Sequence, residues 1–346
     1  MCRKEHIPAG MKNFPIYTQR ISIETLNYEG MVKMKVVLLE SLGIAAEKVE
    51  EKAAFLREAG HSFEAYERNM DEEVQIARAS DADAIIIANM PLSGRVIDAC
   101  RNLKFIDVAF TGVDHVALEH AARRNIAVSN ASGYSNEAVA ELTLNMMLSL
   151  LRNVPQVEKR CREGKTKDGL VGCELRGKTV GIIGTGAIGS RVAEICHFFG
   201  CRVIAYSRHS KESSFITYLP LEEVLRQSDI VTLHCPLNEE TRGLISEEKI
   251  ALMKKGAYLI NSARGPVVDS EALAKALCEG KLAGAGIDVF ETEPPLDIKH
   301  PLLQAPNVIA TPHVAFATKE SMEVRADIVF DNLKSWMAGK QVNKIL

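Results

Sequence analysis

The chain has 346 residues, of which 42 are Lys or Arg and 45 are Asp or Glu, so its formal net charge is only −3. This length favours two domains, each with its own hydrophobic core, and the balanced charge without a basic block argues against nucleic acid as a partner. The longest apolar runs, such as residues 84–88, are strand-sized and far below the ~20 residues that a membrane helix needs, so we expect no membrane partner.

Residues 1–33 precede the first recognisable strand and are expected to be an N-terminal extension, either a product of an upstream start codon or a true arm. They contain neither a continuous apolar core nor a small-residue cleavage pattern, so the sequence does not predict a secretory signal. The scattered cysteines indicate reduced thiols in a cytoplasmic protein. Cys196 and Cys201 flank His197, but no second ligand pair follows, so no metal site is expected.

Short apolar runs alternate with helix-like stretches along the rest of the chain. The runs "KVVLL", "AIIIA", "KFIDVAF" and "IAVSN", with a helix-like segment at residues 47–59, predict a first βα unit. A long apolar helix is predicted over residues 136–151. A second series then begins with "KTVGII" and continues with "RVIAY", "DIVTLHC", "AYLINSA" and "AGAGIDVF". This order predicts a parallel, doubly wound sheet.

We therefore predict an α/β protein with a Rossmann-type cofactor domain and a discontinuous, flavodoxin-like substrate domain. Residues 34–133 form the first part of the substrate domain, and residues 134–313 form the dinucleotide-binding domain. The second sheet does not need the amphipathic helix within residues 314–346. That helix is expected to return to the substrate domain.

Three glycines lie between the strand "KTVGII" and the helix "AIGSRVAEICHFF". Gly184 permits a tight turn, Gly186 lets the backbone approach a pyrophosphate, and Gly189 lets the helix pack on the strand. The helix N-terminus adds free N–H groups and a positive dipole end. This context favours a dinucleotide site over the alternative of a tight βα turn without a ligand.

The next strand ends at "YSRHS", where an NAD site usually has an Asp or Glu that binds the ribose hydroxyls. Ser207 is neutral, while Arg208 and His209 make this edge polar and cationic. A guanidinium matches the geometry of a phosphate, so the sequence predicts NADP as the preferred cofactor, with NAD possible. In the alternative, Arg208 stacks on adenine or is solvated while NAD is used.

Three further motifs, "MKKGAYLINSARGPVVDSEAL", "LAGAGIDVFETEPP" and "ATPHVAFAT", follow the glycine segment in order. From Lys35 to the C-terminus the chain resembles the D-isomer-specific 2-hydroxyacid dehydrogenase family. The resemblance implies that Arg264, Glu293 and His313 are catalytic. Arg264 would hold the substrate carboxylate and polarise the carbonyl, and His313 would protonate the forming alkoxide. Glu293 would favour the imidazolium form of His313 and orient its ring.

Each of these residues also has a simpler interpretation when it is taken alone. Arg264 could be a surface cation after a strand, Glu293 a solvated loop acid and His313 a capped loop histidine. Their joint occurrence in the order of the family, at positions where strands end, favours the catalytic interpretation.

The resemblance also assigns binding residues. Backbone N–H groups of Gly112 and Val113 would bind the substrate carboxylate, and Tyr134 and Phe316 would line the pocket; Phe316 could instead be core packing. Asp288 would contact the nicotinamide side of the cofactor, or could be a strand-end cap or turn acid. The remaining cofactor residues are Ala187, Ile188, Cys235, Pro236, Thr241, Ser262 and Ala263.

These observations predict an oxidoreductase that reduces a small 2-oxo acid, such as glyoxylate, hydroxypyruvate or a pyruvate-like acid, to its D-2-hydroxy acid. The resemblance implies a homodimer formed through the cofactor domain, which the helix from Asn136 would suit. The segment "HVAFAT" resembles the D-lactate branch, whereas the basic turn resembles glyoxylate and hydroxypyruvate reductases, so the substrate stays open. The alternative is a dinucleotide-sensing, corepressor-like regulator on the same scaffold.

Overall fold

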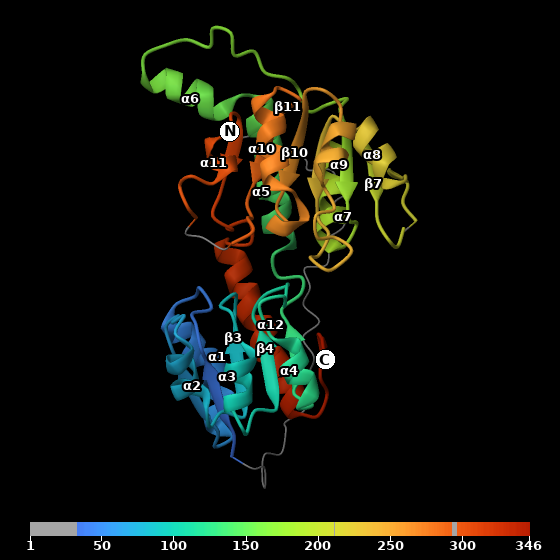
Figure 1. Cartoon of the computed structure of the whole chain (residues 1–346). Helices are drawn as coiled ribbons and strands as arrows, with labels where there is room; N and C mark the ends of the chain where they lie inside the picture. Colours follow the sequence, from blue (N-terminus) through green and yellow to red (C-terminus); the bar gives the residue numbers. More distant parts are fainter. Residues whose placement is uncertain (1–32, 211, 293–295) are drawn as a thin grey trace, which may run out of the picture. The chain divides into compact units, whose positions relative to one another are not determined.

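The computed structural model describes residues 33–210, 212–292 and 296–346 (Figure 1). Residues 33–346 form one compact unit that contains two fully parallel sheets. Most of the predicted N-terminal extension lies outside the described residues. No helix within the described part of the chain is long and apolar enough to cross a membrane.

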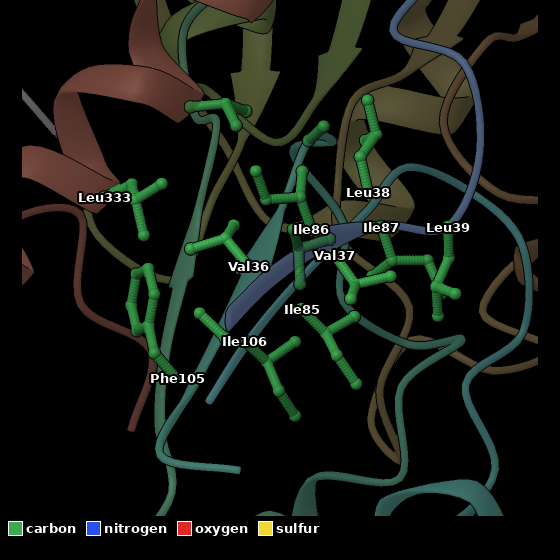
Figure 2. Close-up of a cluster of buried hydrophobic side chains, with 14 of the residues drawn as sticks. Val36, Val37, Leu38, Leu39, Ile85, Ile86, Ile87, Phe105, Ile106 and Leu333 are labelled. Carbon is green, nitrogen blue, oxygen red and sulfur yellow. The ribbon is translucent and has the colours of Figure 1, made fainter. Parts of the chain in front are cut away.

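The first sheet has five strands in the order β2-β1-β3-β4-β5, which is the flavodoxin-like order. Its strands are β1 (Lys35–Leu38), β2 (Ser62–Ala65), β3 (Ala84–Ile87), β4 (Phe105–Val108) and β5 (Ala127–Asn130). The helices in this part of the chain are α1 (Ala46–Glu58), α2 (Glu72–Ala79), α3 (Gly94–Ala99) and α4 (Leu118–Arg123). Every residue of β3 and β4 is buried, which explains why both strands are apolar except for Asp107 in β4. Figure 2 shows side chains of β1, β3 and β4 gathered with Leu333 in this core.

The C-terminal helix α12 (Lys319–Met337) packs against α1, β4 and β5 (Figure 1). The Trp336 ring stacks on Phe105 with centroids 4.7 Å apart. Below it, Asn332 Nδ2 donates a hydrogen bond of 2.9 Å to Asp107 Oδ1 inside the core. Burial raises the pKa of Asp107 well above its ordinary value, against the opposing effect of this bond. The helix therefore belongs to the first core, while the domain boundaries given above stay a prediction.

The second sheet has seven strands in the order β12-β11-β10-β9-β6-β7-β8. Its strands are β6 (Thr179–Ile183), β7 (Arg202–Tyr206), β8 (Ile216–Tyr218), β9 (Ile230–Leu233), β10 (Ala257–Asn261), β11 (Leu282–Ile287) and β12 (Val308–Ala310). This is the Rossmann order with one further strand, and it confirms the predicted fold class. The strand order reverses between β6 and β9, where ligands of open α/β sheets bind at the carboxyl ends of the strands.

Helices surround this second sheet and connect its strands. They are α5 (Asn136–Leu151), α6 (Val154–Arg162), α7 (Ala187–Phe198), α8 (Leu221–Gln227), α9 (Glu247–Leu252), α10 (Ser270–Cys278) and α11 (Pro301–Gln304), with a 3₁₀ turn η1 at Gly265–Val267. The predicted long helix is confirmed as α5, which packs on α7, β10 and β11 of its own chain. The predicted helix at residues 47–59 is α1, shifted by one residue.

Candidate active site

A cavity of about 570 Å³ is lined by loops that follow strands of both sheets. Most of the predicted site residues meet at its wall. These are Gly112, Val113, Tyr134, Gly186, Ala187, Ile188, Cys235, Pro236, Ser262, Ala263, Arg264, Asp288, His313 and Phe316. Six predicted cofactor residues lie outside this lining, namely Gly184, Gly189, Ser207, Arg208, His209 and Thr241. Glu293 lies outside the residues that the structure describes.

The glycine turn after β6 leaves a cradle for a pyrophosphate. Gly184 has φ +93°, and a Cβ there would lie 2.8 Å from the backbone oxygen of His234. A Cβ on Gly189 would lie 2.0 Å from the Gly184 oxygen, so the helix packs directly on the turn. A Cβ on Gly186, the N-cap of α7, would meet nothing within 4 Å. The N-terminus of α7 is therefore open to an anion, and these residues fit a dinucleotide.

Arg264 enters the cavity from the turn between β10 and η1. Its Nε donates a hydrogen bond to Asp114 Oδ1 at 3.2 Å. Its Nη1 donates one to the backbone oxygen of the preceding residue, Ala263, at 2.8 Å. Burial opposes ionisation of Asp114, but the Arg264 charge, together with hydrogen bonds to the carboxylate, holds the pKa of Asp114 below its ordinary value. Gly112 has no room for a side chain, because its Cβ would lie 1.7 Å from Arg264 Nη2. The cation is thus held between a carboxylate and a bare backbone.

His313 lies in a loop that the buried carboxylate of Asp288 organises. Thr311 Oγ1, Val314 N and Ala315 N donate to this carboxylate at 2.5, 2.9 and 2.9 Å. Burial raises the pKa of Asp288, while these bonds oppose the rise. The bonds fit the turn-acid alternative for Asp288, and its contact with the nicotinamide side stays a prediction.

The backbone of His313 is itself unusual. Its φ of +54° lies in the left-handed region, which a residue other than glycine seldom adopts, and its N–H donates a hydrogen bond to the backbone oxygen of Asp288 at 2.7 Å. The imidazole meets the rings of Phe110 and Phe316 edge to face, each with centroids 5.7 Å apart. Strained residues of this kind concentrate at functional sites.

Three aromatic rings form one wall of the cavity. Phe110 and Phe316 meet with centroids 4.9 Å apart, and Tyr134 and Phe316 with centroids 6.4 Å apart. Burial raises the pKa of Tyr134 to about 12. This wall is predominantly apolar and faces the same space as Arg264 and His313.

The end of β7 differs from a dinucleotide site with an acidic residue. Ser207 is half-buried there, and Arg208 and His209 are exposed. Arg208 Nη1 donates to Glu240 Oε2 at 3.0 Å, and both side chains of this pair are more than half exposed. Sequence reasoning did not identify Glu240, because it lies 32 residues away in the chain.

The loop after β9 contributes a histidine that was not predicted as a site residue. His234 lines the cavity, and its Nε2 lies 3.0 Å from Thr232 Oγ1. Burial lowers the pKa of His234 to about 3, so this imidazole is neutral near neutral pH. Nearby, Thr241 accepts a hydrogen bond from Asn238 N at 2.9 Å and donates to the Pro236 oxygen at 2.6 Å. Thr241 therefore shapes the loop that carries Cys235 and Pro236.

The parallel sheet with a glycine cradle at its switch point, and the Arg and His beside it, define a dinucleotide-binding α/β oxidoreductase. The sequence model of the D-isomer specific 2-hydroxyacid dehydrogenase, NAD binding domain, matches residues 144–315. The chain is 36% identical over 285 residues to a hydroxypyruvate reductase of Blautia hydrogenotrophica, covering 80% of this chain and 88% of the relative. It is 40% identical over 271 residues to a glyoxylate reductase of Thermofilum pendens, covering 75% and 80%.

A solved structure of an acyclic imino acid reductase in complex with NADPH and D-Arg superimposes with a TM-score of 0.84 at 30% identity. That match covers 90% of this chain and all of the other. The chain belongs to the D-isomer-specific 2-hydroxyacid dehydrogenase family. It is accordingly a dehydrogenase that depends on a nicotinamide dinucleotide.

Proposed function

We propose that the enzyme reduces a small 2-oxo acid, of the glyoxylate, hydroxypyruvate or pyruvate type, to the D-2-hydroxy acid. The observation that carries this proposal is that Arg264, His313 and the Gly186 turn line one cavity. The names of the two relatives, a hydroxypyruvate reductase and a glyoxylate reductase, support this substrate class. They also favour an enzyme over the dinucleotide-sensing regulator.

Arg264 is proposed to bind the substrate carboxylate and to polarise the 2-oxo group. Its planar guanidinium offers paired N–H donors, and Asp114 limits the directions in which it can point. Backbone N–H groups of Gly112 and Val113 are proposed to bind the same carboxylate. Their position on the cavity wall beside Arg264 supports this role.

His313 is proposed to donate the proton that the forming alkoxide needs. The Asp288 carboxylate holds the following backbone N–H groups, and two aromatic rings confine the imidazole. A general acid of this kind must lie within hydrogen-bond reach of the reacting oxygen, and a fixed loop serves that purpose. Glu293 keeps its proposed role as the partner of His313, which rests on the family resemblance.

The reduced nicotinamide supplies the hydride when the cofactor is bound. We propose that the enzyme prefers NADPH, with NADH as the less favoured cofactor. Ser207 supports this preference because it places no carboxylate at the end of β7, and Arg208 lies beside it. The ion pair of Arg208 with Glu240 is exposed, and such pairs contribute only ~0–1 kcal/mol, so a 2′-phosphate can compete for the guanidinium.

A homodimer is proposed as the working form. Helix α6 supports it, because none of its residues is buried within its own chain, and Val171 in the following segment is 77% exposed. Helix α5 packs on α7, β10 and β11 of its own chain, so α6 and the segment after it are the better candidates for the subunit contact. Light scattering coupled to size-exclusion chromatography measures the state directly.

Initial rates with glyoxylate, hydroxypyruvate and pyruvate, each with NADPH and with NADH, test the proposed function. A reductase turns over at least one of these acids, whereas a sensor binds the cofactor with negligible turnover. The same panel reports the preference between the two cofactors.

A further inference from the structure

Arg325 is a buried cation that the roles described so far do not use. It lies in the second turn of α12, and only 4% of its surface is exposed. No carboxylate among the described residues lies within 4 Å of its guanidinium, and its Nε has no hydrogen-bond partner there. Burial lowers the pKa of Arg325. A buried charge without an ion-pair partner is unfavourable, so its retention calls for a reason.

The hydroxyl of Tyr134 is the main polar partner of Arg325, and it compensates the charge only in part because it is neutral near neutral pH. The guanidinium carbon lies 5.9 Å from the ring centre of Tyr134 and 6.0 Å from that of Phe316. These distances are at the outer limit of cation–π contact. Both rings line the cavity, so Arg325 lies directly behind the aromatic wall.

Glu40 is the carboxylate that acts on Arg325 through its charge, and it is engaged elsewhere. Glu40 is buried, and its Oε1 accepts hydrogen bonds from Ala88 N and Met90 N at 2.8 and 2.7 Å. Its Oε2 lies 4.0 Å from Arg68 Nη1. Glu40 is therefore fixed at the end of β3, and it forms no ion pair with Arg325 within 4 Å.

We propose that the substrate carries a second anionic group, a carboxylate at the end of its side chain, which the Arg325 charge attracts toward the aromatic wall. Resting on the proposed function, this inference makes the favoured substrates 2-oxo dicarboxylic acids. Arg264 binds the carboxylate next to the 2-oxo group. Arg325 lies behind the aromatic wall and attracts the distal carboxylate by its charge, without touching it. The energy of two opposite charges several ångströms apart is substantial where water is excluded.

The test compares 2-oxoglutarate with its 5-methyl monoester, which keeps the 2-oxo acid end of the molecule and lacks the distal negative charge. The ratio of their kcat/KM values isolates the distal charge, and the wild-type ratio is expected to be about tenfold or more. Arg325→Met should bring this ratio close to one, whereas Arg325→Lys should keep most of it. Lys319→Met removes an exposed cation from the start of the same helix and should leave the ratio unchanged.

Thermal unfolding shows whether each variant is folded before its rates are compared. A wild-type ratio of one or less, or an Arg325→Met ratio equal to that of the wild type, overturns the inference. If Arg325→Met does not fold, the ratios of the wild type and of Arg325→Lys are used instead. A wild-type ratio of about tenfold that Arg325→Lys mostly keeps supports the inference, and a wild-type ratio of one or less overturns it. Reduction of glyoxylate, hydroxypyruvate or pyruvate without any preference for the diacid refutes only this inference. Failure of every 2-oxo acid refutes the proposed function instead.

Discussion

Replacing Gly112 with Ala should displace the Arg264 guanidinium. The new Cβ would lie 1.7 Å from Arg264 Nη2 and 2.8 Å from Asp114 Oδ1, whereas ordinary contact needs about 3.5 Å. The Gly112 backbone is outside the left-handed region, so Ala adds no backbone strain and the effect is a direct clash. Nη2 must therefore move by more than about 1 Å, and a misplacement of that size costs ~10²-fold in rate. This corresponds to about 2.7 kcal/mol of transition-state stabilisation.

The assay is the steady-state rate of 2-oxo acid reduction, with cofactor affinity measured separately by fluorescence titration. Gly112→Ala should lower kcat/KM by about a hundredfold and leave cofactor affinity nearly unchanged. In an enzyme that already carries Arg264→Gln, Gly112→Ala should lower kcat/KM little further, because the effect of Gly112→Ala acts through Arg264. A Gly112→Ala enzyme with wild-type kcat/KM, or an equal loss in both backgrounds, would refute the reasoning.

Three further changes test other parts of the site and the core. His313→Gln should lower turnover by about 10²–10⁴-fold while the enzyme still binds cofactor, and near wild-type rates would exclude His313 as the acid. The wild type should show a KM for NADPH lower by about tenfold than for NADH at low salt, and Ser207→Asp with Arg208→Ala should reverse this order; an unchanged order refutes the assignment. Because burial raises the pKa of Asp107 in the folded state, its carboxyl stays protonated there while that of the unfolded chain ionises above the ordinary value of 3.8, so the stability of the wild type falls as pH rises above that value. Asp107→Asn should therefore gain stability relative to the wild type between pH 4 and pH 7 in thermal unfolding, and a difference independent of pH contradicts this.

Much of the fold can be predicted because the sequences of buried parallel strands are mainly apolar. The strands β3, β4, β6 and β9 are buried along their whole length, and each was predicted from a run that is mainly apolar. The runs that led to the prediction did not include β2, β8 or β12. All three strands lie at sheet edges; β2 and β8 mix polar with apolar residues, and β12 has only three residues, so their local pattern is weak. Their pairing depends on neighbours that are distant in the chain.

The site is predictable only where its residues lie in local motifs. Arg264 and His313 follow strand ends in recognisable segments, and the structure brings them to one cavity. Asp114 could not be identified in the same way, because its bond to Arg264 joins residues 150 positions apart. Arg325 appears as one of several charges on an amphipathic helix, and only the packing of α12 shows that it is buried behind the aromatic wall.

The configuration and isotope content of the product test the central claim most directly. Hydroxypyruvate and pyruvate are reduced with NADPH that carries deuterium at both C4 positions of the nicotinamide. The products are separated on a chiral column, and their masses are measured by mass spectrometry. The account predicts D-glycerate and D-lactate, each with one deuterium on C2. The L-enantiomer, or a product without deuterium, would contradict direct hydride transfer in a D-specific site.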